Sequence, residues 1–160
     1  MIFLFCYIKA DNICRFLSPN KTMKISTKSQ YGLRAMIYLA SIYRKNKFCS
    51  LRIISKKENI SFDYLEKIVS KLKKAGLVKS KKGIQGGYSL ACQPEKIKIG
   101  KIIRILEGTM APVLCVAKEK EKRFICPRRK ICLTKNVWQK IQDSLNLTLN
   151  SITLADLAKK

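Results

Sequence analysis

Apolar residues recur at helical spacing in the first part of the chain. From Ser26 onward, positions i, i+3, i+4 and i+7 form a stripe that consists of Leu33, Met36, Ile37 and Ala40. This spacing is typical of an amphipathic helix with one face turned toward a core. A serine or threonine at its start can bind the first free amides. The pattern therefore predicts a helix that begins near Ser26 and breaks at residues 45–47.

Two further helical patterns follow at once. The stretch "SLRIISKKE" predicts a short helix from Ser50, and "SFDYLEKIVSKLKKAG" predicts a longer helix that Ser61 caps and Gly76 ends. Asn59 stands where a tight turn would join the two helices. The inner face of the longer helix is apolar and consists of Leu65, Ile68, Val69 and Leu72. Two short helices joined by a tight turn are typical of a helix-turn-helix unit.

The next stretch, "LVKSKKGIQGGYSLA", predicts a strand, a glycine-rich turn and a second strand. Leu77 and Val78 belong to the first arm of this hairpin, and Tyr88 and Leu90 to the second. A hairpin directly after the second helix makes the unit a winged helix. We therefore expect a mostly α-helical protein with a small β-hairpin wing, in which residues 23–95 form a winged helix-turn-helix DNA-binding domain.

The rest of the chain divides into three parts. Residues 96–109 include "IKIGKIIRILEG" and predict a connecting helix that Gly108 ends. Residues 110–132 predict a loop with cysteines. Residues 133–160 predict a dimerisation helix and a tail, in which an apolar residue recurs at every fourth position and Trp138 broadens the stripe: Val137, Ile141, Leu145 and Leu149.

The charge balance narrows the choice of partner. The 160-residue chain has 34 Lys and Arg against 10 Asp and Glu, a formal net charge of +24. Such an excess opposes compaction, and a polyanion relieves it, with nucleic acid as the leading candidate and an anionic membrane as the second. A compositional bias of the genome is the alternative explanation. The position of the charge favours DNA, because no acid interrupts a run of lysines over the end of the second helix and the first arm of the wing: Lys71, Lys73, Lys74, Lys79, Lys81 and Lys82.

Base reading requires hydrogen-bonding side chains on the outer N-terminal face of the second helix. The residues at these positions are Ser61, Asp63, Tyr64, Glu66 and Lys67. A carboxylate there can accept from a cytosine amino group, and Tyr64 can bond a phosphate. The alternatives stay open: Ser61 as a cap only, and Glu66 and Lys67 as a solvated face. Gly86 and Gly87 fit a positive φ in the turn and also a close approach to the DNA backbone or minor groove.

Three of the seven cysteines stand in one charged segment, "CVAKEKEKRFICPRRKIC", at Cys115, Cys126 and Cys132. Thiolates are soft ligands for iron–sulfur clusters, zinc and copper(I), and the nearby Lys and Arg residues favour the thiolate form. Zinc usually takes four ligands at closer spacing, which is absent here. From the residues alone, an iron–sulfur cluster, another metal or thiol switch, and inert thiols all remain possible. Cys49 and Cys92 fall within predicted elements and fit structural roles.

Residues 1–22 show no convincing periodicity and end in the turn-like run "SPNKT". We expect a disordered leader or an upstream extension, with Met23 as the functional start. The apolar run "MIFLFCYI" lacks a basic region and a cleavage site and is too short to span a bilayer. We therefore expect a cytoplasmic protein with no membrane partner, in which clustered cysteines suggest a metal before a disulfide.

An enzyme is the hypothesis that the chain supports least. It has no histidine, and it lacks paired carboxylates and a nucleotide-binding loop. We expect neither catalytic residues nor a small-molecule substrate.

Several of these stretches closely resemble a family of winged-helix transcriptional regulators that includes IscR, NsrR, RirA and CymR. The resemblance runs from Met23 to the C-terminus and covers "MKISTKSQYGLRAMIYLA", "ISFDYLEKIVSKLKKAGLVKSKKGIQGGYSLA", "IIRILEG" and "VWQKIQDSLNLTLNSITLADL". It implies a homodimeric regulator, expected to be a repressor, that binds palindromic operators in double-stranded DNA and pairs through its long C-terminal helix. The groove-reading positions of the family match Ser61, Asp63, Tyr64 and Glu66, and Lys82 matches the basic wing position. With Lys67, Lys71, Gly86 and Gly87, these are the expected DNA-binding residues.

The resemblance also bears on the cysteines. Members with three cysteines after the helix that contains Glu-Gly bind an iron–sulfur cluster, and Cys115, Cys126 and Cys132 match those positions, which implies a cluster of the 2Fe–2S or 4Fe–4S type. The chain departs from the family at the fourth ligand. Lys135 stands where some members have histidine, and Gln30 stands where others have aspartate. Glu119, Glu121, Gln30 or a small thiol could serve, and the alternative is a cluster-free regulator controlled by a protein partner, thiol oxidation or another metal.

Overall fold

The computed structural model describes residues 25–45, 47–117, 126, 128 and 131–158. The expected leader, residues 1–22, lies outside them. The α-helices and strands follow in the order α1 (Thr27–Tyr43), α2 (Leu51–Glu58), α3 (Phe62–Lys74), β1 (Val78–Lys81), β2 (Gly87–Leu90), α4 (Ile99–Glu107), α5 (Lys135–Ser151) and α6 (Leu154–Ala158). Two short 3-10 turns, η1 (Pro94–Lys96) and η2 (Leu114–Val116), lie on either side of α4. A mostly helical fold with a two-stranded wing is confirmed.

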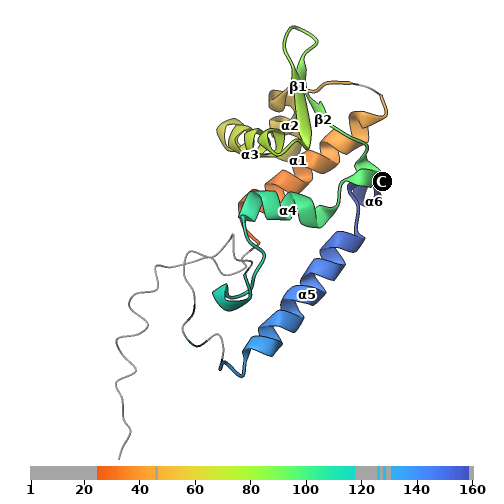
Figure 1. Cartoon of the computed structure of the whole chain (residues 1–160). Helices are drawn as coiled ribbons and strands as arrows, with labels where there is room; N and C mark the ends of the chain where they lie inside the picture. Colours follow the sequence, from red (N-terminus) through yellow and green to blue (C-terminus); the bar gives the residue numbers. More distant parts are fainter. Residues whose placement is uncertain (1–24, 46, 118–125, 127, 129–130, 159–160) are drawn as a thin grey trace, which may run out of the picture.

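Helix α1 is the centre of the molecule, and α3, α4 and α6 pack around it (Figure 1). Its buried residues include Ala35, Met36 and Leu39. Gly32 lies at the crossing with α4 and α3, where a Cβ atom would stand 2.3 Å from Leu106 Cδ1. The absence of a side chain at this glycine therefore lets the helices approach closely.

The turn between α2 and α3 has the geometry that the sequence predicts. Asn59 ends α2 with a φ of 50° and a ψ of 54°, a left-handed conformation that asparagine tolerates better than most residues. Arg34 of α1 also holds this corner. Its guanidinium donates to the carboxylate of Glu58 at 2.9 Å and to the Glu58 backbone carbonyl. The end of α2 is therefore tied to the central helix, which orients α3.

The wing is an antiparallel hairpin that pairs Val78 with Leu90 and Lys81 with Gly87. The chain just before α2 extends this pairing, because Cys49 and Tyr88 exchange backbone hydrogen bonds of 3.0 and 2.8 Å. Cys49 is buried in this bridge, and burial raises the pKa of its thiol. The base of the wing is thus attached to the body, while its tip projects outward (Figure 1).

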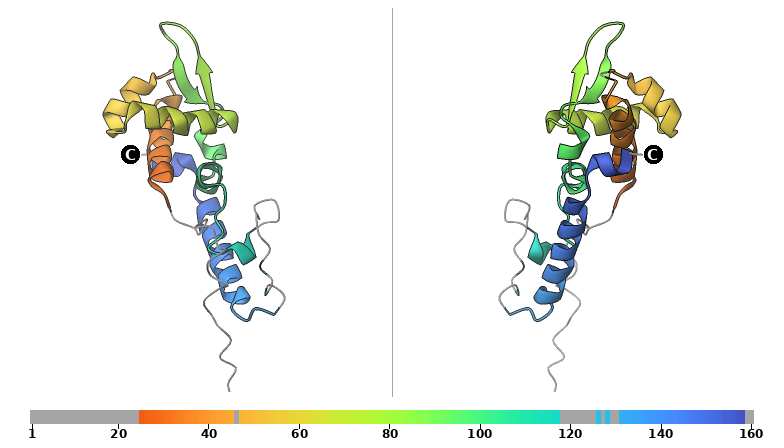
Figure 2. Two further views of the ribbon diagram at one scale, coloured as in Figure 1. Left: turned by 90° about the vertical axis from the view of Figure 1, so that its left-hand side faces the viewer. Right: turned by 90° about the vertical axis from the view of Figure 1, so that its right-hand side faces the viewer.

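Helix α5 extends away from the body that α1, α2, α3 and the wing form, with η2 beside it (Figure 2). After it, the chain returns to the body, where Leu154 donates a backbone hydrogen bond to Ile97 at 2.8 Å. The following residues, within the segment expected to be a tail, form α6, with Leu154 and Ala155 buried. Thr153 and Asp156 cap this helix reciprocally, since the Thr153 N–H donates to the Asp156 carboxylate at 2.9 Å and the Thr153 hydroxyl accepts from the Asp156 N–H at 3.3 Å.

None of the helices in the described part of the chain combines the length and the hydrophobicity needed to cross a lipid bilayer.

Candidate nucleic-acid interface and cysteine segment

Helix α3 has one face in the core and the other in solvent. Its apolar residues Leu65, Ile68, Val69 and Leu72 are buried, as the periodicity predicts. The opposite side carries exposed polar residues, among them Asp63, Glu66, Lys67 and Lys71. The body of the protein leaves this polar side uncovered, so it is accessible to a large partner.

Two of the expected base-reading residues, Ser61 and Tyr64, also take part in the structure of the helix or its packing. Ser61 occupies the N-cap position of α3 and is exposed, but its side chain makes no capping hydrogen bond. The predicted N-cap position of Ser61 is therefore confirmed, but the expected capping hydrogen bond from its side chain is not. Tyr64 is half-buried, and its ring meets Tyr31 of α1 edge-on, with 6.0 Å between the ring centroids. The Tyr64 ring thus stabilises the contact between α1 and α3.

No flexible linker separates α3 from the wing. The N–H of Leu77 donates to the carbonyl of Leu72 at 3.0 Å, and the N–H of Gly76 donates to that of Lys73 at 3.0 Å. With Gly76 at a φ of 74°, this is a Schellman ending, and Leu72 and Leu77 are both buried beside it. The orientation of the wing relative to α3 is therefore determined by hydrogen bonds and core packing.

Seven exposed lysines form what we call the basic surface: Lys67, Lys71, Lys73, Lys74, Lys79, Lys81 and Lys82. They lie on the adjoining α3 and β1, and on the first residue after β1. The ion pairs among the described residues are Arg34–Glu58 and Arg44–Glu95, so none of these lysines is neutralised there. Like charges at this density repel one another, and the phosphates of a duplex would relieve the repulsion.

A hollow of about 670 Å³ runs beside α3 and extends the basic surface to other elements. Its lining includes Lys67 and Lys71 of α3, Tyr88 of β2 and Lys28 of α1. Lys28 was not predicted to take part in this surface. No local pattern marks it, because α3 and α1 meet only through tertiary packing.

Gly86 and Gly87 both have structural roles in the wing. A Cβ atom on Gly86 would lie 2.3 Å from the Lys81 carbonyl oxygen. Gly87 has a φ of 141°, and a Cβ atom there would lie 2.5 Å from the Cys49 carbonyl oxygen. Both positions exclude a side chain. The expected positive φ is confirmed for Gly87 but is wrong for Gly86, where the close approach of the Lys81 carbonyl requires glycine instead.

The cysteine segment, residues 110–132, is described only in part, because residues 118–125, 127 and 129–130 lie outside the described residues. Cys115, in η2, packs half-buried against a small cluster that includes Ala111, Val116 and Trp138 of α5. Cys115, Cys126 and Cys132 are all free thiols. In the described ranges, no three His, Cys, Asp or Glu side chains gather closely enough to hold a metal ion. The thiols therefore have the chemistry of soft-metal ligands, but they are not assembled into a site.

Cys132 has the environment of a thiolate. The Thr134 hydroxyl, 3.2 Å from the sulfur, lowers the pKa of the Cys132 thiol, and backbone N–H groups of Thr134 and Lys135 and the charge of Arg128 add to the effect. The thiolate is the form that binds metals and reacts with oxidants. Of the candidate further ligands, Gln30 lies exposed on α1, while Glu119 and Glu121 fall outside the described residues.

A hydrogen-bonded carboxylate joins the start of α1 to the start of the cysteine segment. Glu107, the last residue of α4, accepts from the Ser26 N–H at 2.9 Å, the Ser26 hydroxyl at 2.7 Å and the Ser29 hydroxyl at 2.5 Å. Burial raises the pKa of Glu107, but these hydrogen bonds and the charge of Lys28 outweigh it and lower the pKa below its ordinary value. The sequence does not reveal this contact, since the partners are 78 and 81 positions apart.

Comparisons with known proteins agree with this arrangement. The family model Rrf2, described as an iron-dependent transcriptional regulator, matches residues 25–160. The transcriptional regulator CymR of Bacillus subtilis is 42% identical over 136 residues, which cover 85% of this chain and 90% of the relative. Its solved structure, titled as that of the global cysteine regulator, superposes with a TM-score of 0.68 and covers 86% of this chain and 97% of the other. The structure of T. potens IscR has a TM-score of 0.66 at 41% identity and covers 85% of this chain and 86% of that one.

Proposed function

The chain belongs to the Rrf2 family of transcriptional regulators, and from this premise we propose that it is a repressor that binds operator DNA as a homodimer, with an affinity that an iron–sulfur cluster modulates. The observation that carries the DNA-binding part is the basic surface, which lies unpaired on α3 and the wing. The protein acts in the cytoplasm and is not an enzyme.

The DNA contacts follow from the two exposed elements. Helix α3 enters the major groove, where the carboxylates of Asp63 and Glu66 accept hydrogen bonds from cytosine amino groups. The hydroxyl of Ser61 can donate to or accept from the edge of a base in the same groove. Lys67, Lys71 and Lys82 bind phosphates, which orients the protein on the duplex and contributes most of the affinity. Gly86 and Gly87 let the wing backbone approach the DNA closely. Tyr64 contributes its hydroxyl to a phosphate while its ring supports the helix.

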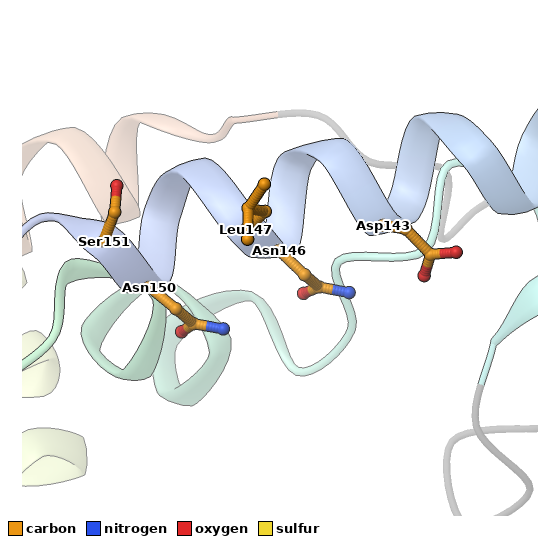
Figure 3. Close-up of a pocket in the computed structure, with 5 residues that line it drawn as sticks. All are labelled: Asp143, Asn146, Leu147, Asn150 and Ser151. Carbon is orange, nitrogen blue, oxygen red and sulfur yellow. The ribbon is translucent and has the colours of Figure 1, made fainter.

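The dimer forms through α5. Val137 is 55% exposed and Ile141 40%, although both belong to the apolar stripe, and Leu147, which lies outside the stripe, is 77% exposed. One hollow of α5 is lined by Ile141, Leu145 and Leu149, and another, shown in Figure 3, by Asp143, Asn146, Leu147, Asn150 and Ser151. A second copy of the helix would cover these apolar side chains. Two copies related by a two-fold axis would also place two α3 helices on a palindromic operator.

Cys115, Cys126 and Cys132 would hold the cluster. Three free thiols, one of them with a lowered pKa, fit the donor set that iron–sulfur clusters take. When bound, the cluster would supply a redox-labile cross-link within the segment that connects α4 to α5. Glu107 ends α4 and holds the start of α1, so a change in this segment would reach the DNA-binding unit through this contact.

A second candidate is a cluster-free regulator of the same fold, controlled by a protein partner, thiol oxidation or another metal. Two observations favour it. No metal-holding group is assembled within the described ranges, and CymR, at 42% identity, is as similar as T. potens IscR, at 41%. In this case Cys132 is the first thiol to be oxidised, because its lowered pKa favours the reactive thiolate.

Two measurements test these proposals separately. Selection of duplexes from a random pool by the purified protein, followed by affinity against salt, tests DNA binding. We expect enrichment of a palindrome and an affinity that falls steeply with salt. The absence of enrichment together with a flat salt dependence would reject DNA recognition.

Anaerobic purification tests the cluster. We expect a brown protein with bound iron, whose colour each of the variants C115A, C126A and C132A reduces or abolishes, and whose affinity for the selected duplex changes when the cluster is removed at constant salt. A colourless protein without iron supports the second candidate. Equal affinity with and without cluster would remove the sensing role and leave DNA binding intact.

A further inference from the structure

Ile84 stands at the tip of the wing with its side chain entirely in solvent. Its relative exposure of 107% is the highest among the large apolar residues of the described chain. Most of the others with high exposure lie on or just before α5, where a second copy would cover them: Ile131, Leu133, Val137, Ile141 and Leu147. Ile84 belongs to the turn between β1 and β2, and this turn lies at the opposite end of the molecule from α5 (Figure 1). The side chain of Ile84 adds nothing to the core of the protein. Contact with a binding partner would explain why an apolar residue stands at this exposed position.

The tip is a tight turn rather than a loose loop. Gly86 donates a backbone hydrogen bond to the Gly83 carbonyl at 2.8 Å, which places Ile84 and Gln85 at the two central positions of the turn. Gly86 packs against the Lys81 carbonyl and Gly87 against the Cys49 backbone. The hairpin therefore holds the isoleucine outward in a defined direction before any partner binds, which lowers the entropy cost of insertion.

The charge around the tip identifies the partner as DNA. Lys79, Lys81 and Lys82 are exposed on the same hairpin, and no acidic residue occurs between Glu66 and Glu95. This combination of lysines and an apolar tip matches a groove of the duplex. The phosphates along both edges of the groove would bind the lysines, and the bases at its floor would contact the apolar side chain. Two other partners fit the wing tip less well. Binding to a hydrophobic protein surface would not require the lysines, and binding to a membrane would not require that the wing be held rigidly against α3.

The geometry points to the groove next to the one that α3 occupies. Ile84 is six positions from Val78, so the tip of the wing can lie at most roughly 20 Å from the base of the hairpin. Half a turn of B-form DNA, which separates a major groove from the adjacent minor groove, is about 17 Å. Because the Schellman ending of α3 fixes the wing, docking of α3 in the major groove places Ile84 at the minor groove.

We propose that Ile84 is an apolar wedge that enters the minor groove, partly unstacks one base step and bends the operator. This inference rests on the proposed DNA-binding function and extends it to a residue that makes no polar contact. Apolar side chains in the minor groove are a known way to open a base step and kink a duplex. The isoleucine supplies the wedge, Lys81 and Lys82 hold the flanking phosphates, and flexible pyrimidine–purine steps become the preferred sequence at that position.

The experiment compares wild type, I84S and I84L on the duplex that wild type selects. Single adenines are replaced by the fluorescent analogue 2-aminopurine at each position in turn, and the bend is measured by energy transfer between dyes at the two duplex ends. We expect a fluorescence increase at one step on each side of the palindrome for wild type and I84L. We expect I84S to lose this increase, to bend the duplex less and to bind it roughly tenfold more weakly.

Salt dependence separates the wedge from the electrostatic contacts. A wedge neutralises no phosphate, so I84S keeps the wild-type slope of log affinity against log salt, whereas K82A lowers the slope by about one. The I25S variant replaces another exposed isoleucine, outside the wing, and is expected to match wild type. If I84S had the affinity, bend and fluorescence of wild type, the proposal that Ile84 acts as a wedge would be wrong. An effect of K82A in the same experiment would still support the contact between the wing and DNA. If K82A and I84S both had no effect, the proposed contacts of the wing with DNA would fail together.

Discussion

The carboxylate of Glu107, the last residue of α4, accepts a hydrogen bond from the hydroxyl of Ser26, 2.7 Å away at the N-cap of α1. The first helix of the DNA-binding unit is thereby attached to the point where the cysteine segment begins. Unlike an apolar contact between the same helices, this hydrogen bond depends on the ionised carboxylate of Glu107. The negative charge at the N-terminus of α1 also complements the positive end of the helix dipole.

Replacement of Glu107 tests this attachment. The variant E107A loses all three hydrogen bonds and E107Q loses the charge, so we expect free energies of unfolding lower by about 2 and about 1 kcal/mol, after allowance for solvent screening. The Glu107 pKa is lowered by folding, so its contribution is present above the ordinary carboxyl range and is lost as pH falls through the lowered value. Urea unfolding of wild type and E107Q should therefore differ at pH 7 and converge in acid. A difference that stays constant with pH would show that the charge has no role.

The close crossing at Gly32 predicts a second effect on stability. A Cβ atom at this position would meet Leu106 Cδ1 at 2.3 Å and Ile68 Cγ2 at 3.2 Å, both in the core. We expect G32A to destabilise the protein by about 1–3 kcal/mol despite the better helix propensity of alanine. The double variant G32A/L106A supplies space and should cost less than the sum of the two single variants in thermal unfolding. Additive effects would show that the helices can separate freely.

The basic surface predicts the salt dependence of DNA binding. K67A and K71A should each lower the slope of log affinity against log salt by about one, because each removes one phosphate contact. The change should be similar on selected and unselected duplexes, since phosphates carry no sequence. Lys96 of η1 lies outside the basic surface, and K96A is the matched control. Fluorescence anisotropy titrations at several salt concentrations measure these slopes. If K96A lowered the slope as much as K67A and K71A, the effect would come from the overall charge of the protein and not from the basic surface.

The exposed apolar face of α5 predicts the oligomeric state. We expect I141D to convert a dimer into a monomer, because two buried carboxylates would oppose each other across a two-fold axis. N136D adds the same charge at an exposed polar position of the same helix and should remain a dimer. Sedimentation velocity distinguishes the two species. A wild-type protein that is monomeric at micromolar concentration would remove the dimer from the proposal.

Local pattern was enough to predict most of the elements. The apolar spacing of α3, the glycine at Gly76 and the hairpin around Gly86 each depend on residues that are close in sequence, so the winged helix-turn-helix and the lysines on its outer side can be predicted without the tertiary structure. The capping pair Thr153 and Asp156 is also local, and it marks the start of α6 within the segment expected to be a tail.

The packing of the whole fold determines which apolar faces are covered and which distant groups meet. The periodicity of α5 treats Val137 and Leu149 alike, but the first is exposed and the second packs on the core, since only one end of the helix reaches the body. The ring of Tyr64 turns toward Tyr31, and Glu107 reaches back to Ser26, because packing brings together residues far apart along the chain. Periodicity encodes which side of an element is apolar, whereas the neighbour on that side depends on how all the elements pack at once.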